Sequence, residues 1–385
     1  MLRAIVSDFK AAGHSVTTLL DSRLFALNAP LEAERVIPVS SLEEADAAVR
    51  KVAAEQVDVV LVIAPESEGV LQSLVARVER TGTPLLNCSS VAIGKVADKF
   101  LLQEHIKRLG LPTPESLIFS IHEEAEAVSQ AINEKVGFPV VIKPLDGVGC
   151  AGLSLVLGKN DVSGAMAKIR KESSGKFFMT QQFIKGVPVS VSVVSTGEES
   201  LPISLNKQDV SLGTPDSASS YDGGIVPLDS SLKRKTFDLA KRIVESFRGL
   251  KGYVGVDLVL SESEAFVIEV NPRLTTSYVG VRKVVQSNPA EAVLNSVLEG
   301  RLPSNQESVG YACFSKVQTL KPTIEALKTT YDIDDVVSPP FPVSTDESAC
   351  ALLCSHRNTL ENAKRGLDEA KKRLLGKSIG GRQRW

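Results

Sequence analysis

The sequence predicts an α/β protein, with α+β character in parts, that is long enough at 385 residues for two or three domains. Strand-like and helix-like segments alternate over residues 1–90, which is the pattern of a parallel sheet with helices on both faces. A strand, a glycine-rich loop and a second strand follow at 137–157, and a strand and an amphipathic helix follow after residue 300. These three observations set the expected fold class.

The first 90 residues are expected to alternate helices and strands. Apolar residues at Leu2, Ile5, Val6 and Phe9 mark one face of a helix that Gly13 ends. The elements expected after it are a strand over 15–21, a helix over 41–56, a buried strand over 57–65, a helix over 68–82 and a short strand over 84–87. Because the chain opens with a helix, the first strand of such an alternating unit is missing from this pattern.

The middle of the chain has a different pattern. Residues 89–114 predict one helix, closed by a glycine and two prolines. Residues 137–157 predict a β-hairpin, whereas a P-loop or a Rossmann turn leads from a strand into a helix, so neither of those nucleotide-binding turns fits. The later elements expected are a strand on each side of Gly186, a loop over 211–224, a helix over 232–252 and a strand and helix over 349–376.

Charge and cysteine content exclude several classes of function. Charged residues make up 23% of the chain and the net charge is −2, which argues against a nucleic-acid-binding surface. The five cysteines show no CxxC pair and no zinc-like spacing, which fits a reducing cell interior. No apolar run is long enough to span a membrane and the opening residues do not form a signal peptide, so we expect a cytoplasmic protein. Whether it forms a homo-oligomer is left open.

Polar residues interrupt two apolar strands near residue 260. If 262–264 form the loop of a hairpin, Asp257 faces Glu269 and residue 255 faces Asn271, so the strand period of two puts the three polar side chains on one face. Two carboxylates and an amide oxygen suit Mg²⁺, or Mn²⁺, completed by substrate phosphates. Two acids on a solvent-facing edge strand are the alternative, but unpaired carboxylates among buried valines are costly.

Lys143 ends the first strand of the hairpin at 137–157 and shortly precedes Gly147 and Gly149. The backbone N–H groups of such a loop can contact phosphate oxygens, so the lysine, the glycine loop and a remote Mg²⁺ site together indicate a nucleoside triphosphate. Alternatively, the lysine extends its ammonium group to solvent. Arg273 could stabilise charge on a transferring phosphoryl group, or could pair with a neighbouring acid. The four histidines are scattered, and none indicates a protein nucleophile.

In this order the motifs resemble the ATP-grasp superfamily of carboxylate–amine ligases, over residues 90–300. The segments "ADKFLLQEHIKRLGLPTP", "VVIKPLDGVGCAG", "MTQQFIKG" and "DLVL…FVIEVNPRL" are similar to four motifs of that family. The resemblance implies an ATP-grasp fold preceded by a parallel α/β pre-ATP-grasp domain. It implies that the ATP phosphates contact Lys99, Lys143, Gly147 and Gly149, and that the adenine pocket is formed by Gln181, Gln182, Phe183 and Ile184. It also implies that Mg²⁺ (or Mn²⁺) is bound by Asp257, Glu269 and Asn271. Catalytic roles are implied for Arg273 and Lys143.

The same resemblance suggests how the chain is divided. A pre-ATP-grasp domain is expected over 1–90, an ATP-grasp domain over 91–300 with a glycine-loop lid at about 115–185, and a C-terminal strand–helix segment with a basic tail over 301–385. Three positions depart from the family pattern. Gln181 and Gln182 stand where the hinge usually carries acids, and Pro188 stands where a glutamate commonly binds the ribose, so ribose contacts are not implied.

Several segments, among them "KGYVGVDLVL" and "NPRLTTSYVG", look like one branch of this superfamily, the tyramine–glutamate ligases of methanofuran biosynthesis. That resemblance implies an ATP-dependent ligase that joins the γ-carboxyl of L-glutamate to the amine of tyramine through an acyl phosphate. Its partners would be small molecules, with no nucleic acid and no membrane. Residues 223–227 and 274–277 are expected to line the acceptor side. Two alternatives stay open, an amino-acid or peptide ligase with another carboxylate and amine, and a nucleotide-binding regulator without turnover.

Overall fold

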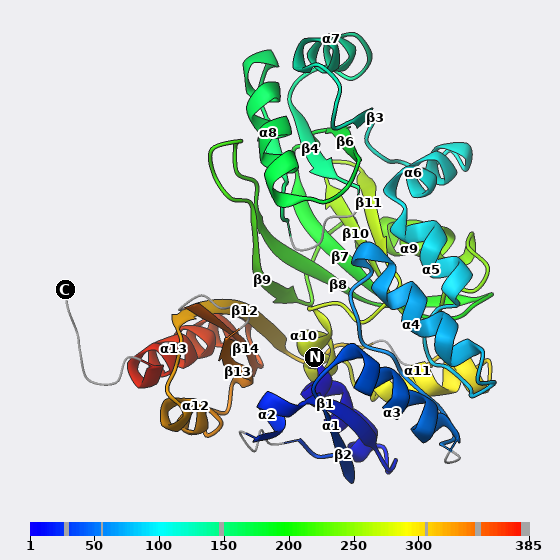
Figure 1. Ribbon diagram of the computed structural model, residues 1–385, viewed down its shortest axis with the longest axis vertical. Coiled ribbons are helices and arrows are strands. Elements are labelled where there is room, and N and C mark those ends of the chain that lie inside the picture. Colours follow the sequence, from blue (N-terminus) through cyan, green and yellow to red (C-terminus); the bar gives the residue numbers. More distant parts are fainter. Residues whose placement is uncertain (27–30, 55–56, 146–149, 305–306, 343–347, 379–385) are drawn as a thin grey trace.

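The computed structural model describes residues 1–385 except 27–30, 55–56, 146–149, 305–306, 343–347 and 379–385. Its described strands form a two-stranded, a four-stranded and an eight-stranded sheet. In Figure 1 the four-stranded sheet lies at one end of the long axis and the N-terminal elements lie at the other, with the eight-stranded sheet between them. This mixed α/β architecture agrees with the fold class that the sequence predicts.

The N-terminal part contains a parallel pair of strands flanked by helices. Its elements are α1 (Leu2–Ala11), β1 (Thr17–Asp21), α2 (Ser22–Ala26), β2 (Arg35–Val39), α3 (Leu42–Ala54), the 3₁₀ helix η1 (Ser67–Gly69) and α4 (Val70–Glu79). β1 and β2 pair in parallel, which is the predicted kind of pairing, but the sequence pattern did not predict the strand β2 itself. The strands predicted at 57–65 and 84–87 are wrong, because a single parallel bridge between Val60 and Leu85 replaces a ladder there.

Asn87 explains why no ladder extends past this bridge. Its side-chain Oδ1 accepts a hydrogen bond from the N–H of Val62 at 2.7 Å, and its Nδ2 donates to the carbonyl of Val62 at 2.8 Å. A side chain therefore satisfies the two backbone groups that a neighbouring strand would otherwise pair.

The single helix predicted over 89–114 is two helices, α5 (Ser90–Ala97) and α6 (Lys99–Arg108). Asp98 separates them, with an extended ψ of 103°, and its carboxylate accepts hydrogen bonds from the N–H groups of Phe100 and Leu101. Asp at an N-cap satisfies N–H groups that have no partner within the helix, which favours a new helix start here. The break makes Lys99 the first residue of α6.

The four-stranded sheet has one apolar and one polar face. Its elements are β3 (Ser116–Ser120), α7 (Ala125–Lys135), β4 (Val140–Pro144), β5 (Ser154–Val156), the 3₁₀ helix η2 (Lys159–Asp161), α8 (Val162–Glu172) and β6 (Phe177–Gln182), with strand order β3-β6-β4-β5. The antiparallel pairing of β4 with β5 confirms the predicted hairpin. Apolar side chains such as Ile142 and Phe178 pack with α7 and α8 on one face. Strand alternation turns Lys143 and Gln181 to the other.

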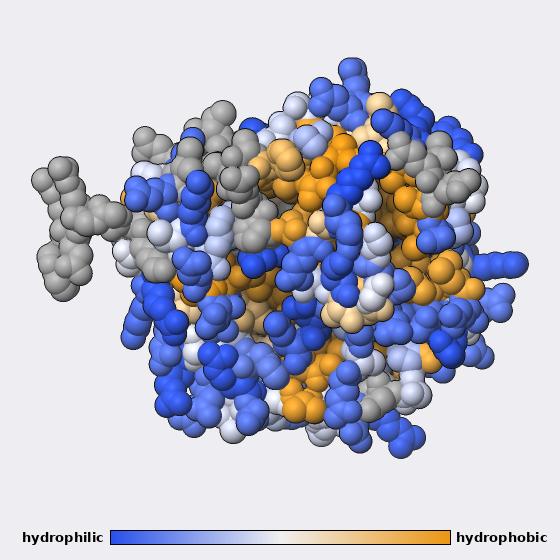
Figure 2. All heavy atoms as spheres, turned by 90° about the horizontal axis from the view of Figure 1, so that it is seen from below, coloured by the Kyte–Doolittle hydropathy of each residue, from blue (hydrophilic) through white to orange (hydrophobic). Residues whose placement is uncertain are grey.

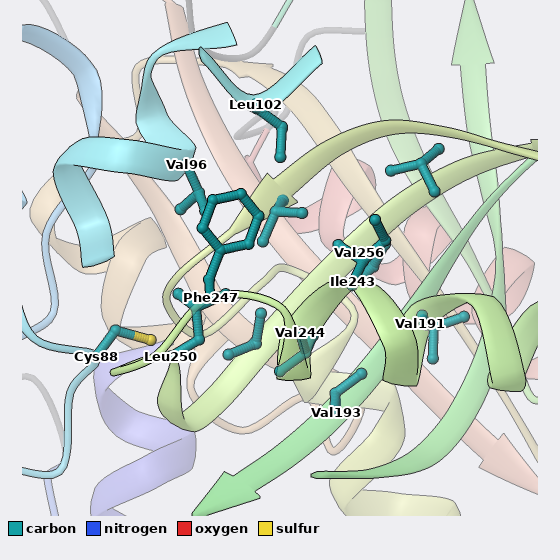
Figure 3. Packing of buried hydrophobic residues seen from close by; sticks show 14 of the residues in the cluster. Cys88, Val96, Leu102, Val191, Val193, Ile243, Val244, Phe247, Leu250 and Val256 are labelled. Carbon is teal, nitrogen blue, oxygen red and sulfur yellow. The ribbon is translucent and has the colours of Figure 1, made fainter. Parts of the chain in front are cut away.

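The eight-stranded sheet has the order β11-β10-β7-β8-β9-β12-β14-β13. Its elements and the helices around it are β7 (Val187–Thr196), β8 (Ser200–Ser211), β9 (Ser220–Val226), α9 (Lys233–Glu245), β10 (Lys251–Leu260), β11 (Ala265–Asn271), α10 (Tyr278–Val284), α11 (Pro289–Leu298), β12 (Tyr311–Leu320), α12 (Ile324–Thr330), β13 (Val336–Pro342), β14 (Ser348–Arg357) and α13 (Leu360–Ser378). Valines of β7 and β10 pack against α9 on one face, as Figure 3 shows for Val256 of β10 and Ile243 of α9. On the opposite face Tyr253 packs with α1, α10 and α11.

The loop predicted over 211–224 is wrong at its C-terminal end, where β9 begins at Ser220. β9 pairs with β8 on one side and with β12 on the other. Gly223 and Gly224 lie so close to both neighbours that an added Cβ would overlap a carbonyl oxygen of Phe314 or of Lys207. The glycines that suggest a loop in the sequence therefore serve close strand packing.

The C-terminal strands extend the eight-stranded sheet, because β12 pairs with β9 and with β14. α13 follows β14, which confirms the predicted strand and helix over 349–376. All five cysteines are free thiols. No helix in the described ranges is both long and apolar enough to cross a bilayer, and hydrophilic residues cover most of the face seen in Figure 2, with hydrophobic patches between them.

Candidate active site

The hairpin of β10 and β11 brings three oxygen-bearing side chains together. Asp257 faces Glu269 and Gly255 faces Asn271, which confirms the predicted register. The actual turn is one residue longer than predicted, since Leu260 pairs with Ala265, but a bulge after Asp257 restores the pairing.

Asp257 is held between two amide side chains. Nδ2 of Asn271 donates to its Oδ2 at 2.9 Å, and Nε2 of Gln208, from β8, donates to its Oδ1 at 3.0 Å. Burial, and next the negative charge of Glu269, raise the pKa of Asp257 to about 7. Two carboxyl groups that oppose each other's ionisation are a site that a divalent cation would stabilise.

Lys99 links helix α6 to this hairpin. Its buried ammonium lies 3.6 Å from Oε1 of Glu269 and donates to the carbonyl of Leu145 at 3.1 Å. Burial alone would raise the pKa of Glu269, but the positive charges of Lys99 and Lys143 outweigh that effect, and its pKa lies below the ordinary value. Glu269 is therefore the ionised carboxylate of the pair.

Lys143 reaches the same place from the four-stranded sheet. Its ammonium is buried and donates to Oε1 of Gln181 at 3.0 Å. Burial lowers the pKa of Lys143 to about 8, although the charge of Glu269 acts in the opposite direction. Nε2 of Gln181 is buried and has no hydrogen-bond partner within the described part of the chain. A buried N–H donor without a partner is costly, so it fits a site that a ligand acceptor completes.

The other three residues of the predicted adenine pocket differ in their exposure to solvent. Gln182 is exposed, while Phe183 and Ile184 are half-buried. The N–H of Phe183 donates to the carbonyl of Pro139 at 3.1 Å, which ties the hinge to the start of β4. Gly147 and Gly149, predicted to contact phosphates, lie outside the described residues.

Arg273 is paired with an acid from the N-terminal part. Its Nε and Nη2 donate to the two carboxylate oxygens of Glu66, the second at 2.9 Å, and its Nη1 donates to the carbonyl of Leu274 at 3.2 Å. Such bidentate pairing fixes the guanidinium plane. The ion pair that the sequence offers as the alternative for Arg273 is therefore present, and it places the guanidinium two residues beyond Asn271.

Residues 274–277, predicted to line the acceptor side, are largely interior. Thr275 and Ser277 are buried, and their hydroxyl oxygens are 2.8 Å apart. Thr276 hydrogen-bonds the hydroxyl of Tyr221 on β9. Sequence reasoning missed Gln208 and Tyr221, although a strand whose polar residues Asn206 and Gln208 recur with period two carries the same signal as β10.

The side chains at the site can be compared with the two ligands that the sequence implies, a divalent metal ion and a nucleoside triphosphate. Among the described residues, no cluster of three or more His, Cys, Asp or Glu side chains could hold a metal ion by itself. Two carboxylates and an amide fit an ion that takes its other oxygens from water and phosphate, as Mg²⁺ does. Two buried ammonium groups beside them fit a polyphosphate. A separate hollow of 690 Å³, lined by Asp229, Lys233 and Tyr311 among others, includes none of these residues.

The comparisons with known proteins agree with this geometry. Residues 96–277 match the model of an ATP-grasp domain, and residues 14–93 match that of a pre ATP-grasp 3 domain. The biotin carboxylase domain of the Hydrogenobacter thermophilus 2-oxoglutarate carboxylase, solved with MgADP, superposes with a TM-score of 0.71 at 12% identity, over 96% of this chain and 87% of that one. At that identity the likeness concerns the fold alone.

Curated relatives are more similar in sequence. The tyramine–L-glutamate ligase of Methanocaldococcus jannaschii is 30% identical over 243 residues, and the match spans 62% of each chain. The D-alanine–D-alanine ligase of Carboxydothermus hydrogenoformans is 31% identical over 219 residues, 53% of this chain and 66% of that protein. The matched stretches therefore cover less than two thirds of either relative.

Proposed function

The chain belongs to the ATP-grasp family, with a pre-ATP-grasp domain before it, and from that premise we propose that it is an ATP-dependent ligase that joins a carboxylate to an amine. The proposal rests above all on one arrangement. Two buried lysines from separate elements, Lys99 and Lys143, meet a hairpin that presents Asp257, Glu269 and Asn271. Opposite charges gathered in this way suit a triphosphate and a divalent ion better than a structural core.

Each side chain has a role in the proposed reaction. Mg²⁺, held by Asp257, Glu269 and Asn271, would neutralise phosphate charge when bound. Lys99 and Lys143 would bind and orient phosphate oxygens of ATP, so that the γ-phosphoryl group meets the substrate carboxylate. The product of that transfer is an acyl phosphate and ADP. Attack by the amine nitrogen on the acyl carbon then forms the amide and releases phosphate.

Arg273 is proposed to stabilise charge at the reacting carboxylate and on the acyl phosphate. Its pairing with Glu66 keeps the guanidinium beside the hairpin, close to the end of β11 where Asn271 stands. If Glu66 moved away from part of the guanidinium, some of the five N–H donors of Arg273 would become available to an anionic group of the substrate.

L-Glutamate and tyramine are the proposed substrate pair, with the γ-carboxyl of glutamate activated. The support is the 30% identity to the Methanocaldococcus jannaschii ligase together with the segments quoted from β10 and the residues after β11. A different amino acid and amine is the alternative, and the D-alanine–D-alanine ligase match supports that class. A place in methanofuran biosynthesis and a cytoplasmic location belong to the same proposal.

A substrate panel tests the proposal. Purified protein with ATP and Mg²⁺ is expected to release ADP and phosphate only when an acid and an amine are both present, and mass spectrometry should detect γ-glutamyltyramine. Asp257→Ala and Glu269→Ala should lower turnover at least about a hundredfold, in line with loss of electrostatic stabilisation. Asp222→Ala, on an exposed acid of the same sheet, is the matched control. Full turnover in both site variants would disprove the metal assignment, and no release with any pair would favour a nucleotide-binding regulator.

A further inference from the structure

A lysine from the C-terminal part lies on the face of the eight-stranded sheet that carries the hairpin acids. Gln208 of β8 pairs with Gly224 of β9, which in turn pairs with Phe314 of β12. Lys316 lies two residues beyond Phe314 and therefore points to the same face as Phe314. Because Gln208 donates to Asp257, this face is also the one that presents the hairpin acids.

Side chains from strands that are not neighbours meet on this face. β8 and β10 are separated by β7, and two strand spacings of about 4.8 Å would hold their backbones roughly 10 Å apart. The 3.0 Å hydrogen bond between Gln208 and Asp257 spans that gap, so their two side chains extend toward each other across β7.

Lys316 is positioned by an aromatic ring. Its ammonium nitrogen lies 4.8 Å from the ring centroid of Tyr221, a cation–π contact. The hydroxyl of Tyr221 in turn bonds Thr276, in the segment that follows Arg273. The charges of Lys316 and of Asp257 both act on the thiol of Cys150, with opposite effects on its pKa, which agrees with their closeness.

The Lys316 ammonium has no carboxylate partner among the residues that the structure describes. Within the described ranges, no acid lies within ion-pair distance of it, and its recorded partner is the ring of Tyr221. The residue as a whole is half-buried. A cation without a counterion attracts an anionic ligand.

We infer that Lys316, held on the ring of Tyr221, binds a second carboxylate of the acid substrate. This inference rests on the proposed ligase function and narrows its acid substrate to dicarboxylic amino acids. Lys99 and Lys143 approach from the β11 edge and the four-stranded sheet, whereas Lys316 comes from β12, beyond β8 and β9. The triphosphate and the second carboxylate would therefore lie on opposite sides of Asp257.

Paired acids that differ by one carboxylate provide the test. L-Glutamate and 4-aminobutyrate share the reacting carboxyl and the amine, and only glutamate carries the second carboxylate. Lys316→Met should raise the KM for glutamate about 10- to 100-fold, the range expected for one charge-assisted hydrogen bond. The KM for 4-aminobutyrate should change less than about twofold. Lys316→Arg should retain part of the preference, because a cation remains.

A lysine outside the site provides the control. Lys321 is exposed, just beyond the end of β12, and Lys321→Met should leave both KM values unchanged. Unaltered ADP affinity shows that the Lys316 variants are folded. If wild type turns over but Lys316→Met raises both KM values equally or neither, the inference is wrong while the ligase function stands. If wild type turns over no acid and amine pair, the proposed function fails, and the inference fails with it.

Discussion

Asp257→Asn should stabilise the ligand-free protein while abolishing its catalysis. The carboxyl group has a folded-state pKa of about 7 against an ordinary 3.8, because it is buried and faces Glu269. A raised pKa means that the folded state holds the proton more tightly than the unfolded chain does. Stability from this group is therefore fully present below about pH 4 and is lost as the pH rises to about 7. An asparagine has no charge to lose.

The size of the effect follows from the shift. About three pKa units at 1.36 kcal/mol each give an upper bound of roughly 4 kcal/mol at pH 8. Asp257 keeps some contact with water and shares its titration with Glu269, so we expect roughly 2 kcal/mol. The amides of Gln208 and Asn271 can turn to offer an oxygen to the new N–H₂ group, so hydrogen bonding is largely kept.

Thermal unfolding of the ligand-free protein at pH 5 and pH 8 measures this difference. The variant should unfold roughly 2–5 °C above wild type at pH 8 and much closer to it at pH 5. Asp222→Asn, which neutralises an exposed acid, should show no such pH dependence. MgATP should then raise the unfolding temperature of wild type but not of Asp257→Asn. A variant less stable than wild type at pH 8, or a difference that does not depend on pH, would refute the reasoning.

Three further changes have defined outcomes. Lys143→Gln should weaken ATP binding about tenfold at pH 7. In wild type, ATP binding should weaken as the pH rises through about 8 and Lys143 loses its proton, and the variant should lack this pH dependence. Titration calorimetry with MgATP at pH 7 and pH 9 measures both effects. Glu66→Gln should weaken the contact that holds the Arg273 guanidinium, and should lower kcat about tenfold without changing the affinity for ATP. Steady-state kinetics measures this, and a raised KM for ATP with unchanged kcat would contradict it. Gly223→Ala should cost about 2 kcal/mol or more in urea unfolding, because φ is +147° and a Cβ would overlap a carbonyl of β12, whereas Gly158→Ala has open space and should have little effect.

The hairpin shows why the central part of the site is predictable from sequence. Polar residues on strands that are otherwise valine, leucine and isoleucine stand out, and a period of two fixes their common face. The assumed loop was one residue short, but the bulge after Asp257 compensates, so the facing pairs are those expected. The prediction thus depended on the pairs near Asp257 and Glu269, not on where the turn lies.

Other errors arise where a side chain replaces a backbone partner. Residues 57–65 have the apolar composition of a buried strand, but Asn87 takes both backbone groups of Val62. Asp98 divides a continuous helical pattern by capping α6. Each of these two features depends on a single polar residue, whereas a periodic pattern averages over many residues. Lys316 was beyond reach for another reason, because it approaches the site from a part of the chain far from the motifs in sequence.

The charges at the site nearly balance one another. Three cations, Lys99, Lys143 and Arg273, are set against three acids, Asp257, Glu269 and Glu66. MgATP, the proposed ligand, would bring net negative charge into this near-neutral cluster. Because the pKa of Lys143 lies near 8, this lysine can take up a proton when phosphate charge approaches, whereas Asp257, with a pKa near 7, would give up its proton to hold the proposed Mg²⁺. Charges that balance without a ligand and protonation states that can change when one binds both suit a site that exchanges a highly charged ligand, and a permanent structural ion cluster would need neither.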